Sequence, residues 1–107
     1  MKNTGIKRVF LIVLDSFGCG AAPDAADFGD ADTCSTLRSV TESGLFPAAN
    51  LTRLGIYNID GVETGTPSSD PIGAHARLRE LSQGKDTTIG HWEMAGIVRN
   101  EPLPTYP

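Results

Sequence analysis

RVFLIVLD, residues 8 to 15, is the stretch of sequence that decides the fold. Its residues are apolar and rich in β-branched side chains without alternation, which is typical of a strand covered on both faces in a parallel α/β sheet. A secretory signal needs an apolar core of about 7–15 residues and a membrane span needs about 20, whereas the six apolar residues here end on Asp15. We therefore predict a buried strand and neither a signal peptide nor a membrane helix.

Two short helices are predicted after this strand and a Gly/Ala/Asp-rich loop. Residues 33–43 have a helical pattern that stops at Gly44. Residues 47–54 form a further helical turn, with Asn50 as a possible cap and Gly55 at its end.

The second half of the chain predicts a loop, a strand and a helix. Residues 59–71 are polar and rich in Gly and Pro, as in a loop. Residues 72–81, IGAHARLREL, alternate between apolar and polar, which indicates a strand with one solvated face. A helix follows from about residue 88 to residue 98. The order strand, helix, strand, helix predicts an α/β fold.

Composition narrows the class of protein. The 107 residues are 39% hydrophobic, enough for a modest core, and the net charge of −4 without a Lys/Arg cluster argues against a nucleic-acid partner. Cys19 and Cys34 form no CxxC pair, so we expect reduced thiols and a cytoplasmic protein.

Residues 100–107 contain three prolines in an extended stretch. We expect this stretch to lead to another element, and the chain to be a fragment of something longer.

Asp15 is the first candidate site residue. It ends the predicted strand and precedes two glycines, where open α/β sheets place their ligands, so its carboxylate could hold a metal ion. Alternatively, it caps the following turn. A dinucleotide-binding loop is disfavoured because Pro23 replaces the third glycine. The Asp-x-Asp pattern of haloacid-dehalogenase-like phosphotransferases fails because Phe17 occupies the second position.

GKDTTIGHWE, residues 84–93, is the second candidate. Asp86 or Thr87 can cap the helix that follows. A hydroxyl at a helix N-terminus lies near unpaired N–H groups and the positive end of the dipole, which favours an alkoxide or a bound phosphate. Metal coordination is one way to activate a threonine. Alternatively, Thr87 is only a cap, and His91 and Trp92 are packing residues.

Three segments together resemble the N-terminal part of the phosphopentomutase family: residues 15–30 (DSFGCGAAPDAADFGD), 50–55 (NLTRLG) and 84–96 (GKDTTIGHWEMAG). The family shows Asp-Ser-x-Gly-x-Gly-x-x-Pro-Asp-Ala and Gly-Lys-Asp-Thr-x-Thr-Gly-His-Trp-Glu motifs, and the resemblance spans roughly residues 7 to 100. It implies an isomerase of nucleoside salvage that interconverts ribose or deoxyribose 1-phosphate and 5-phosphate. It also implies two manganese ions, a phosphothreonine, and a pentose or hexose bisphosphate as activator.

The resemblance assigns roles to individual residues. Asp15 corresponds to a metal ligand. Thr87 corresponds to the threonine that carries the phosphoryl group and also contacts metal. Lys85, Asp86 and His91 correspond to supporting residues, with Lys85 screening phosphate charge and the other two fixing the turn.

The resemblance also implies a fold. We expect residues 1–100 to form the N-terminal part of an alkaline-phosphatase-like metal-binding core, a mixed sheet flanked by helices that is incomplete without its C-terminal part. Residues 101–107 would begin the connection to a cap domain. The remaining metal ligands of the family lie far downstream, so we expect this chain alone to be inactive and marginally stable. Its implied partners are a sugar phosphate and the missing C-terminal portion, with no membrane.

Two departures from the family pattern stand out. Ile89 replaces the second threonine of the motif, and residues 32–36 replace an Asp-Thr-x-Gly-His segment.

The second candidate function is that of another enzyme of the alkaline phosphatase superfamily, such as a cofactor-independent phosphoglycerate mutase or a metal-dependent phosphatase. A non-catalytic truncated polypeptide is the third possibility, since the chain has only two histidines.

Overall fold

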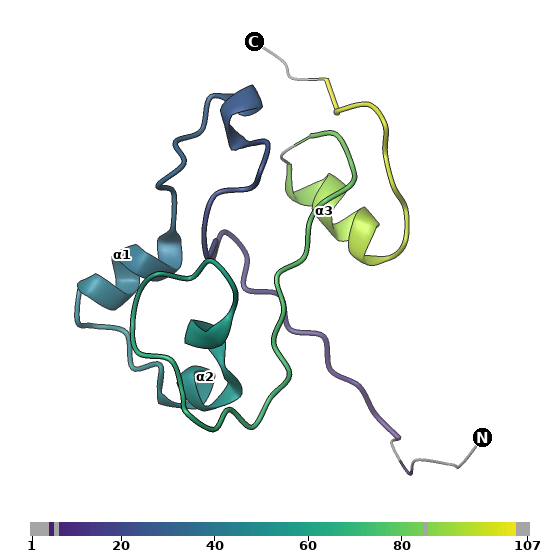
Figure 1. Cartoon of the computed structure of the whole chain (residues 1–107). Helices are drawn as coiled ribbons and strands as arrows, with labels where there is room; N and C mark the ends of the chain where they lie inside the picture. The colour runs from purple at the N-terminus through teal and green to yellow at the C-terminus, as the bar shows by residue number, and fades with distance from the viewer. Residues whose placement is uncertain (1–4, 6, 85, 105–107) are drawn as a thin grey trace.

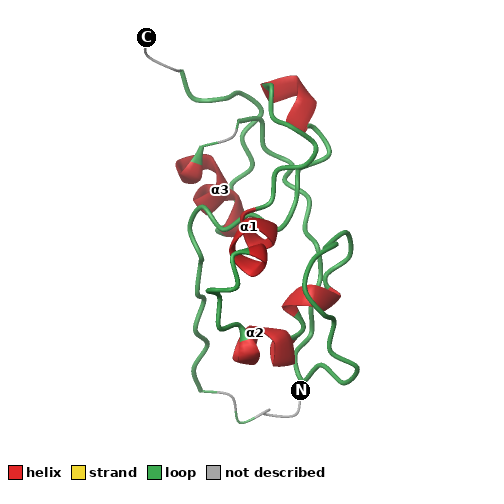
Figure 2. Cartoon of the chain, turned by 90° about the vertical axis from the view of Figure 1, so that its left-hand side faces the viewer, coloured by secondary structure: helices red, strands yellow, loops and turns green. Residues whose placement is uncertain are grey.

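The structure is a computed structural model that describes residue 5, residues 7–84 and residues 86–104. Within these ranges the chain forms short helices joined by long irregular segments (Figure 1). The elements are the 3-10 turns η1 (Ala25–Phe28) and η2 (Ile56–Asn58) and the helices α1 (Thr36–Glu42), α2 (Ala49–Leu54) and α3 (Thr87–Met94). The described ranges contain no strand (Figure 2).

Both predicted strands are therefore wrong for this structure, and the described residues form no sheet. Residues 8–15 and 72–81 run as irregular, mostly exposed segments (Figure 1). Val9 is 86% exposed and Leu78 is 90% exposed. A strand persists only where its N–H and C=O groups pair with a neighbouring strand. The described ranges offer no such neighbour, so the apolar run lies open to solvent.

The first two predicted helices are confirmed, with shorter bounds. Ser35 caps α1, because its hydroxyl oxygen accepts a hydrogen bond of 3.1 Å from the backbone N–H of Arg38. Gly55 ends α2 at a φ of 101°, a conformation that favours glycine. The prediction of Asn50 as a cap is wrong, since the N-cap position is Ala48 and Asn50 lies inside α2.

Helix α3 is confirmed but ends four residues before the predicted position. Gly96 has a φ of 90°, and its N–H donates to the Glu93 carbonyl over 2.8 Å. The N–H of Ile97 donates to the Trp92 carbonyl over 2.9 Å. This pair of bonds is the Schellman arrangement, in which a left-handed glycine stops the helix. Residues 97 and 98 therefore lie outside α3.

The core is small. The apolar residues that are buried within the described ranges are Ala25, Leu37, Tyr57 and Ile89. The chain exposes 8791 Å² of surface, whereas a compact monomer of its mass exposes about 5,700 Å². Much apolar surface is consequently left without cover, most of all on the segment from Val9 to Leu14.

Helix α3 does not pack on the other helices. Among the described elements only α2 and η2 pack against each other. In Figure 1, α3 lies apart from α2 and is flanked by the chain that enters it and the chain that leaves it. The position of α3 therefore depends on its own flanking segments.

Candidate functional site

Asp86 caps α3, as predicted. It has extended backbone angles, and its Oδ1 accepts a hydrogen bond of 3.0 Å from the N–H of Ile89. Thr87 is the first residue of the helix and is exposed. The alternative in which Thr87 serves only as the cap is therefore wrong.

His91 lies one turn after Thr87 on the same face of α3. Its Nδ1 is 2.7 Å from the carbonyl oxygen of Thr87. Because a carbonyl only accepts, Nδ1 is the donor in this hydrogen bond. The structure thus brings Asp86, Thr87 and His91 together, while Lys85 lies outside the described residues.

A pocket of about 560 Å³ opens beside Thr87. Among the described residues, its charged lining consists of one arginine and three carboxylate residues, namely Arg79, Glu80, Asp86 and Glu93. Two of these carboxylates are engaged with backbone groups, because Asp86 caps the helix and Glu93 accepts from the chain before it. Thr87 therefore lies at a pocket in which the described carboxylates outnumber the described cations.

Glu93 makes the most extensive side-chain contact in this region. Its Oε1 accepts a hydrogen bond of 2.8 Å from the N–H of Leu81, and its Oε2 accepts one of 2.7 Å from the N–H of Ser82. Hydrogen bonds from the Ser82 side chain and from these two backbone groups lower the pKa of Glu93. The sequence alone does not reveal this role, because Glu93 lies within residues 84–93 whereas its partners Leu81 and Ser82 precede them and contribute backbone groups.

The chain segments on either side of α3 are joined to each other. The buried Ser82 accepts a hydrogen bond of 3.1 Å from the N–H of Arg99 through its hydroxyl oxygen, and the N–H of Gln83 donates to the Arg99 carbonyl over 2.9 Å. Gly84 has a φ of 125°, and a Cβ there would lie 2.7 Å from Cδ1 of the fully buried Ile89. We call residues 81–84 and 86–102 the α3 unit.

Asp15 lies on a different segment. It sits in a turn in which the N–H of Phe17 donates to the Leu14 carbonyl over 3.2 Å, and Ser16 has a left-handed φ of 57°. The Asp15 side chain accepts no hydrogen bond from the described residues, so the interpretation that it caps this turn is not supported. No hydrogen bond or ion pair between described residues joins Asp15 to Thr87.

The described part of the chain contains no group of three or more His, Cys, Asp or Glu residues that could hold a metal ion. A site for two ions requires several oxygen or nitrogen ligands around each of them. Asp15 and Thr87, on separate segments, do not supply that set. The described residues thus do not fit a two-metal centre by themselves.

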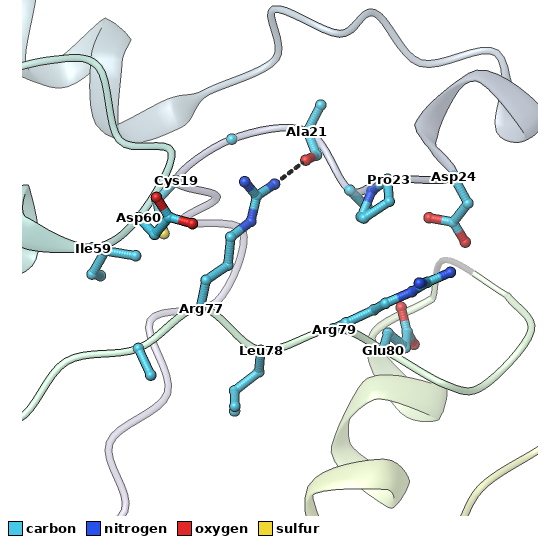
Figure 3. Close-up of a pocket in the computed structure, with 13 residues that line it drawn as sticks. Cys19, Ala21, Pro23, Asp24, Ile59, Asp60, Arg77, Leu78, Arg79 and Glu80 are labelled. Atoms are coloured by element: carbon cyan, nitrogen blue, oxygen red, sulfur yellow. Dashed lines mark hydrogen bonds between the residues drawn. The ribbon is translucent and has the colours of Figure 1, made fainter.

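A second pocket of about 310 Å³ connects the loop after Asp15 with the segment before α3 (Figure 3). Arg77 reaches across it and donates a hydrogen bond to the Ala21 carbonyl. Arg79 and Glu80 line both this pocket and the pocket beside Thr87. The two predicted motifs are therefore linked through residues 77–80.

Within the described ranges, no helix has the length and apolar character needed to cross a membrane.

Comparison with known proteins supports the predicted resemblance. No family model matches the chain. The chain is 48% identical over 103 residues to the phosphopentomutase of Lachnoclostridium phytofermentans, which is 95% of this chain and 26% of that protein. It is 47% identical to the phosphopentomutase of Acetivibrio thermocellus over 103 residues and 46% identical to that of Clostridioides difficile over 102 residues, again 26% of each. At this identity along nearly all of its residues, the chain is homologous to the phosphopentomutases, as its motifs predicted, and it spans about a quarter of their length.

Proposed function

We propose that this chain, completed to the length of its relatives, is a phosphopentomutase that interconverts ribose or deoxyribose 1-phosphate and 5-phosphate. The observation that carries the proposal is the position of Thr87. It is the exposed first residue of α3, it follows a capping aspartate, and it lines the pocket of about 560 Å³. The relatives named phosphopentomutase supply the substrate class.

The start of α3 suits a residue that carries a phosphoryl group. The first N–H groups of a helix lack partners within the helix and carry the positive end of its dipole. Asp86 engages the N–H of Ile89, so the N–H groups of Thr87 and Thr88 remain directed out of the helix start. A phosphate on the Thr87 oxygen would lie next to them.

Carrying phosphate on Thr87 divides the isomerisation into two transfers. In the first, a hydroxyl of the sugar monophosphate attacks the phosphorus. The bond from phosphorus to the Thr87 oxygen breaks, and a pentose bisphosphate forms. In the second, the Thr87 oxygen attacks the other phosphate of that bisphosphate, which releases the isomeric monophosphate and restores phosphothreonine. A pentose or hexose bisphosphate added from outside would prime an unphosphorylated Thr87 in the same way.

The charge of the pocket favours added cations. Among the described residues that line it, Glu80, Asp86 and Glu93 outnumber Arg79, so these side chains together would repel a phosphoryl group near Thr87. Two manganese ions in the complete protein would offset this charge, and bound metal ions activate hydroxyls and polarise phosphoryl oxygens. Asp15 and Thr87 are the ligands that we propose from this chain, with Lys85 and His91 in support.

The open surface of the chain agrees with an incomplete core. Val9 to Leu14 expose apolar side chains that a neighbouring strand and covering helices would bury. We propose that in the complete protein this segment joins the mixed sheet of an alkaline-phosphatase-like core. Cys19 and Cys34 are free and exposed, which suits the reducing cytoplasm.

The test uses a completed protein, defined as this chain joined to the part of the Lachnoclostridium phytofermentans relative that it does not match. We expect it to convert ribose 1-phosphate to ribose 5-phosphate with manganese, and the 107-residue chain alone to show no turnover. Mass spectrometry should locate the phosphate on Thr87.

The substitutions Thr87→Ala and Thr88→Ala provide a matched pair, since both threonines are exposed at the start of α3. Thr87→Ala should abolish turnover, and Thr88→Ala should retain it. Turnover in the Thr87→Ala variant would disprove the assignment of Thr87. Release of inorganic phosphate without isomerisation would instead favour a phosphatase of the same superfamily.

A further inference from the structure

We infer that Glu93 is a positioning residue for the transfer at Thr87. Its carboxylate clamps the chain that enters α3 and thereby sets the direction in which Thr87 faces its pocket. The inference rests on the proposed function, because it concerns the same threonine.

The clamp uses the whole carboxylate. The two oxygens of Glu93 each accept one backbone hydrogen bond, at 2.8 Å from Leu81 and 2.7 Å from Ser82. Hydrogen bonds to an ionised acceptor are stronger than bonds between neutral groups. Ser82 is buried and is tied in turn to Arg99, so the clamp acts on a segment that cannot easily move away.

Glu93 and Thr87 lie on the same helix, so a contact of Glu93 with the preceding chain affects how Thr87 is oriented. Glu93 lies six residues after Thr87, which is about 9 Å along a helix. The clamp therefore holds Ser82 against a later turn of α3 than the one that bears Thr87. Gly84 with its left-handed φ and the Asp86 cap lie between Ser82 and Thr87 in the sequence. The Asp86 cap at the start of α3 and the Glu93 clamp near its end together fix the direction in which the chain enters the helix. They thereby fix the orientation of Thr87.

The same contacts argue against Glu93 as a proton acceptor in the reaction. Glu93 lines the pocket beside Thr87, but both of its oxygens are already held by N–H donors. Hydrogen bonds to the charged form make protonation less favourable. Its contribution is therefore to hold the backbone in place.

The test compares Glu93→Gln with Glu42→Gln in the completed protein. Glutamine preserves size, but its NH₂ group would face a backbone N–H, so one of the two hydrogen bonds is lost. Glu42 is an exposed glutamate in the last turn of α1, so its replacement makes the same change of charge elsewhere. Glu93→Gln should lower kcat about 10- to 100-fold, the loss expected from misplacement of a reacting group by about 1 Å. KM should stay nearly constant, and Glu42→Gln should match the unmodified protein.

Amide hydrogen exchange provides a readout that does not depend on activity. Peptides that contain Leu81 and Ser82 should exchange faster in Glu93→Gln than in the unmodified protein. Glu93→Asp keeps the charge on a shorter side chain that cannot reach both amides, so it should also lose kcat. An Asp variant with full activity would show that charge alone matters and would overturn the inference.

Other outcomes separate this inference from the proposed function. Unchanged exchange in Glu93→Gln would show that the clamp is absent. Faster exchange with unchanged kcat would show that the clamp does not position Thr87. Either result overturns the inference while the function stands. A completed protein without any mutase activity overturns both.

Discussion

Replacement of Gly84 by alanine tests whether the α3 unit is as tightly closed as the structure shows. Gly84 has a φ of 125°, a backbone conformation that costs a residue with a side chain about 1–3 kcal/mol. The new Cβ would lie 2.7 Å from Cδ1 of Ile89 and 3.4 Å from Cα of Pro102. Ile89 is fully buried, so it has little room to move. Overpacking of this kind costs a further amount of about 1–3 kcal/mol.

A smaller effect opposes these costs. Alanine restricts the unfolded chain more than glycine does, which stabilises by about 0.4–1 kcal/mol. The net destabilisation of the α3 unit therefore falls between about 1 and 5.6 kcal/mol, with a midpoint of about 3 kcal/mol. Every 1.4 kcal/mol is about a tenfold change in an equilibrium constant. Amide exchange in peptides from α3 of the completed protein should consequently become more than about tenfold faster.

Gly90 supplies the control for this experiment. It lies inside α3, and a Cβ there would meet no atom within 4 Å. Gly90→Ala should stabilise the helix by about 0.5–1 kcal/mol, because glycine costs conformational entropy in a helix. Exchange in the same peptides should slow by a few-fold. Equal effects of the two substitutions, or slower exchange in Gly84→Ala, would refute the closed arrangement of the α3 unit.

Three further predictions concern the pH dependence, the core and the open surface. The pKa of Glu93 is lowered, so its contribution to stability is fully present above the ordinary glutamate value of about 4.3 and is lost as pH falls through the lowered pKa. The difference in melting temperature between the completed protein and its Glu93→Gln variant should therefore shrink on acidification. A difference that persists at low pH would contradict this prediction. Leu37 is fully buried, so Leu37→Ala should destabilise the completed protein by about 2–5 kcal/mol in urea unfolding, and a cost below about 1 kcal/mol would show that the site is not packed. The isolated chain should self-associate, which light scattering would detect as a mass above the monomer mass of 11.3 kDa. The substitution Ile12→Lys, at a residue that is 80% exposed, should shift the measured mass toward that of the monomer. A monomeric, cooperatively melting chain would refute the prediction.

The helices could be predicted from the sequence because local contacts determine where they begin and end. Ser35 and Asp86 cap their helices through bonds to residues three positions away, and Gly55 supplies the left-handed residue that ends α2. The late end predicted for α3 is a local error, because the apolar Ile97 and Val98 extended the helical pattern past the stop at Gly96.

The strands could not be predicted reliably, because a strand depends on partners elsewhere in the chain. The apolar run from Val9 to Leu14 indicates a strand that is buried on both faces. The described residues, however, supply no strand beside it. The Glu93 clamp escaped prediction for a related reason. Leu81 and Ser82 offer backbone groups, which any residue has, so nothing in the side chains marks them as partners.

The bonds that close the α3 unit also have a kinetic consequence. They join residues that are only 11, 12 and 17 positions apart in sequence. Contacts of such short separation cost little loop-closure entropy and form early, whereas the pairing that we propose for residues 8–15 with a distant strand would form late. The α3 unit, which bears Thr87, can therefore take shape while the apolar N-terminal segment is still unpaired. During synthesis that segment, rather than the site, is the part of the chain that needs protection from other chains.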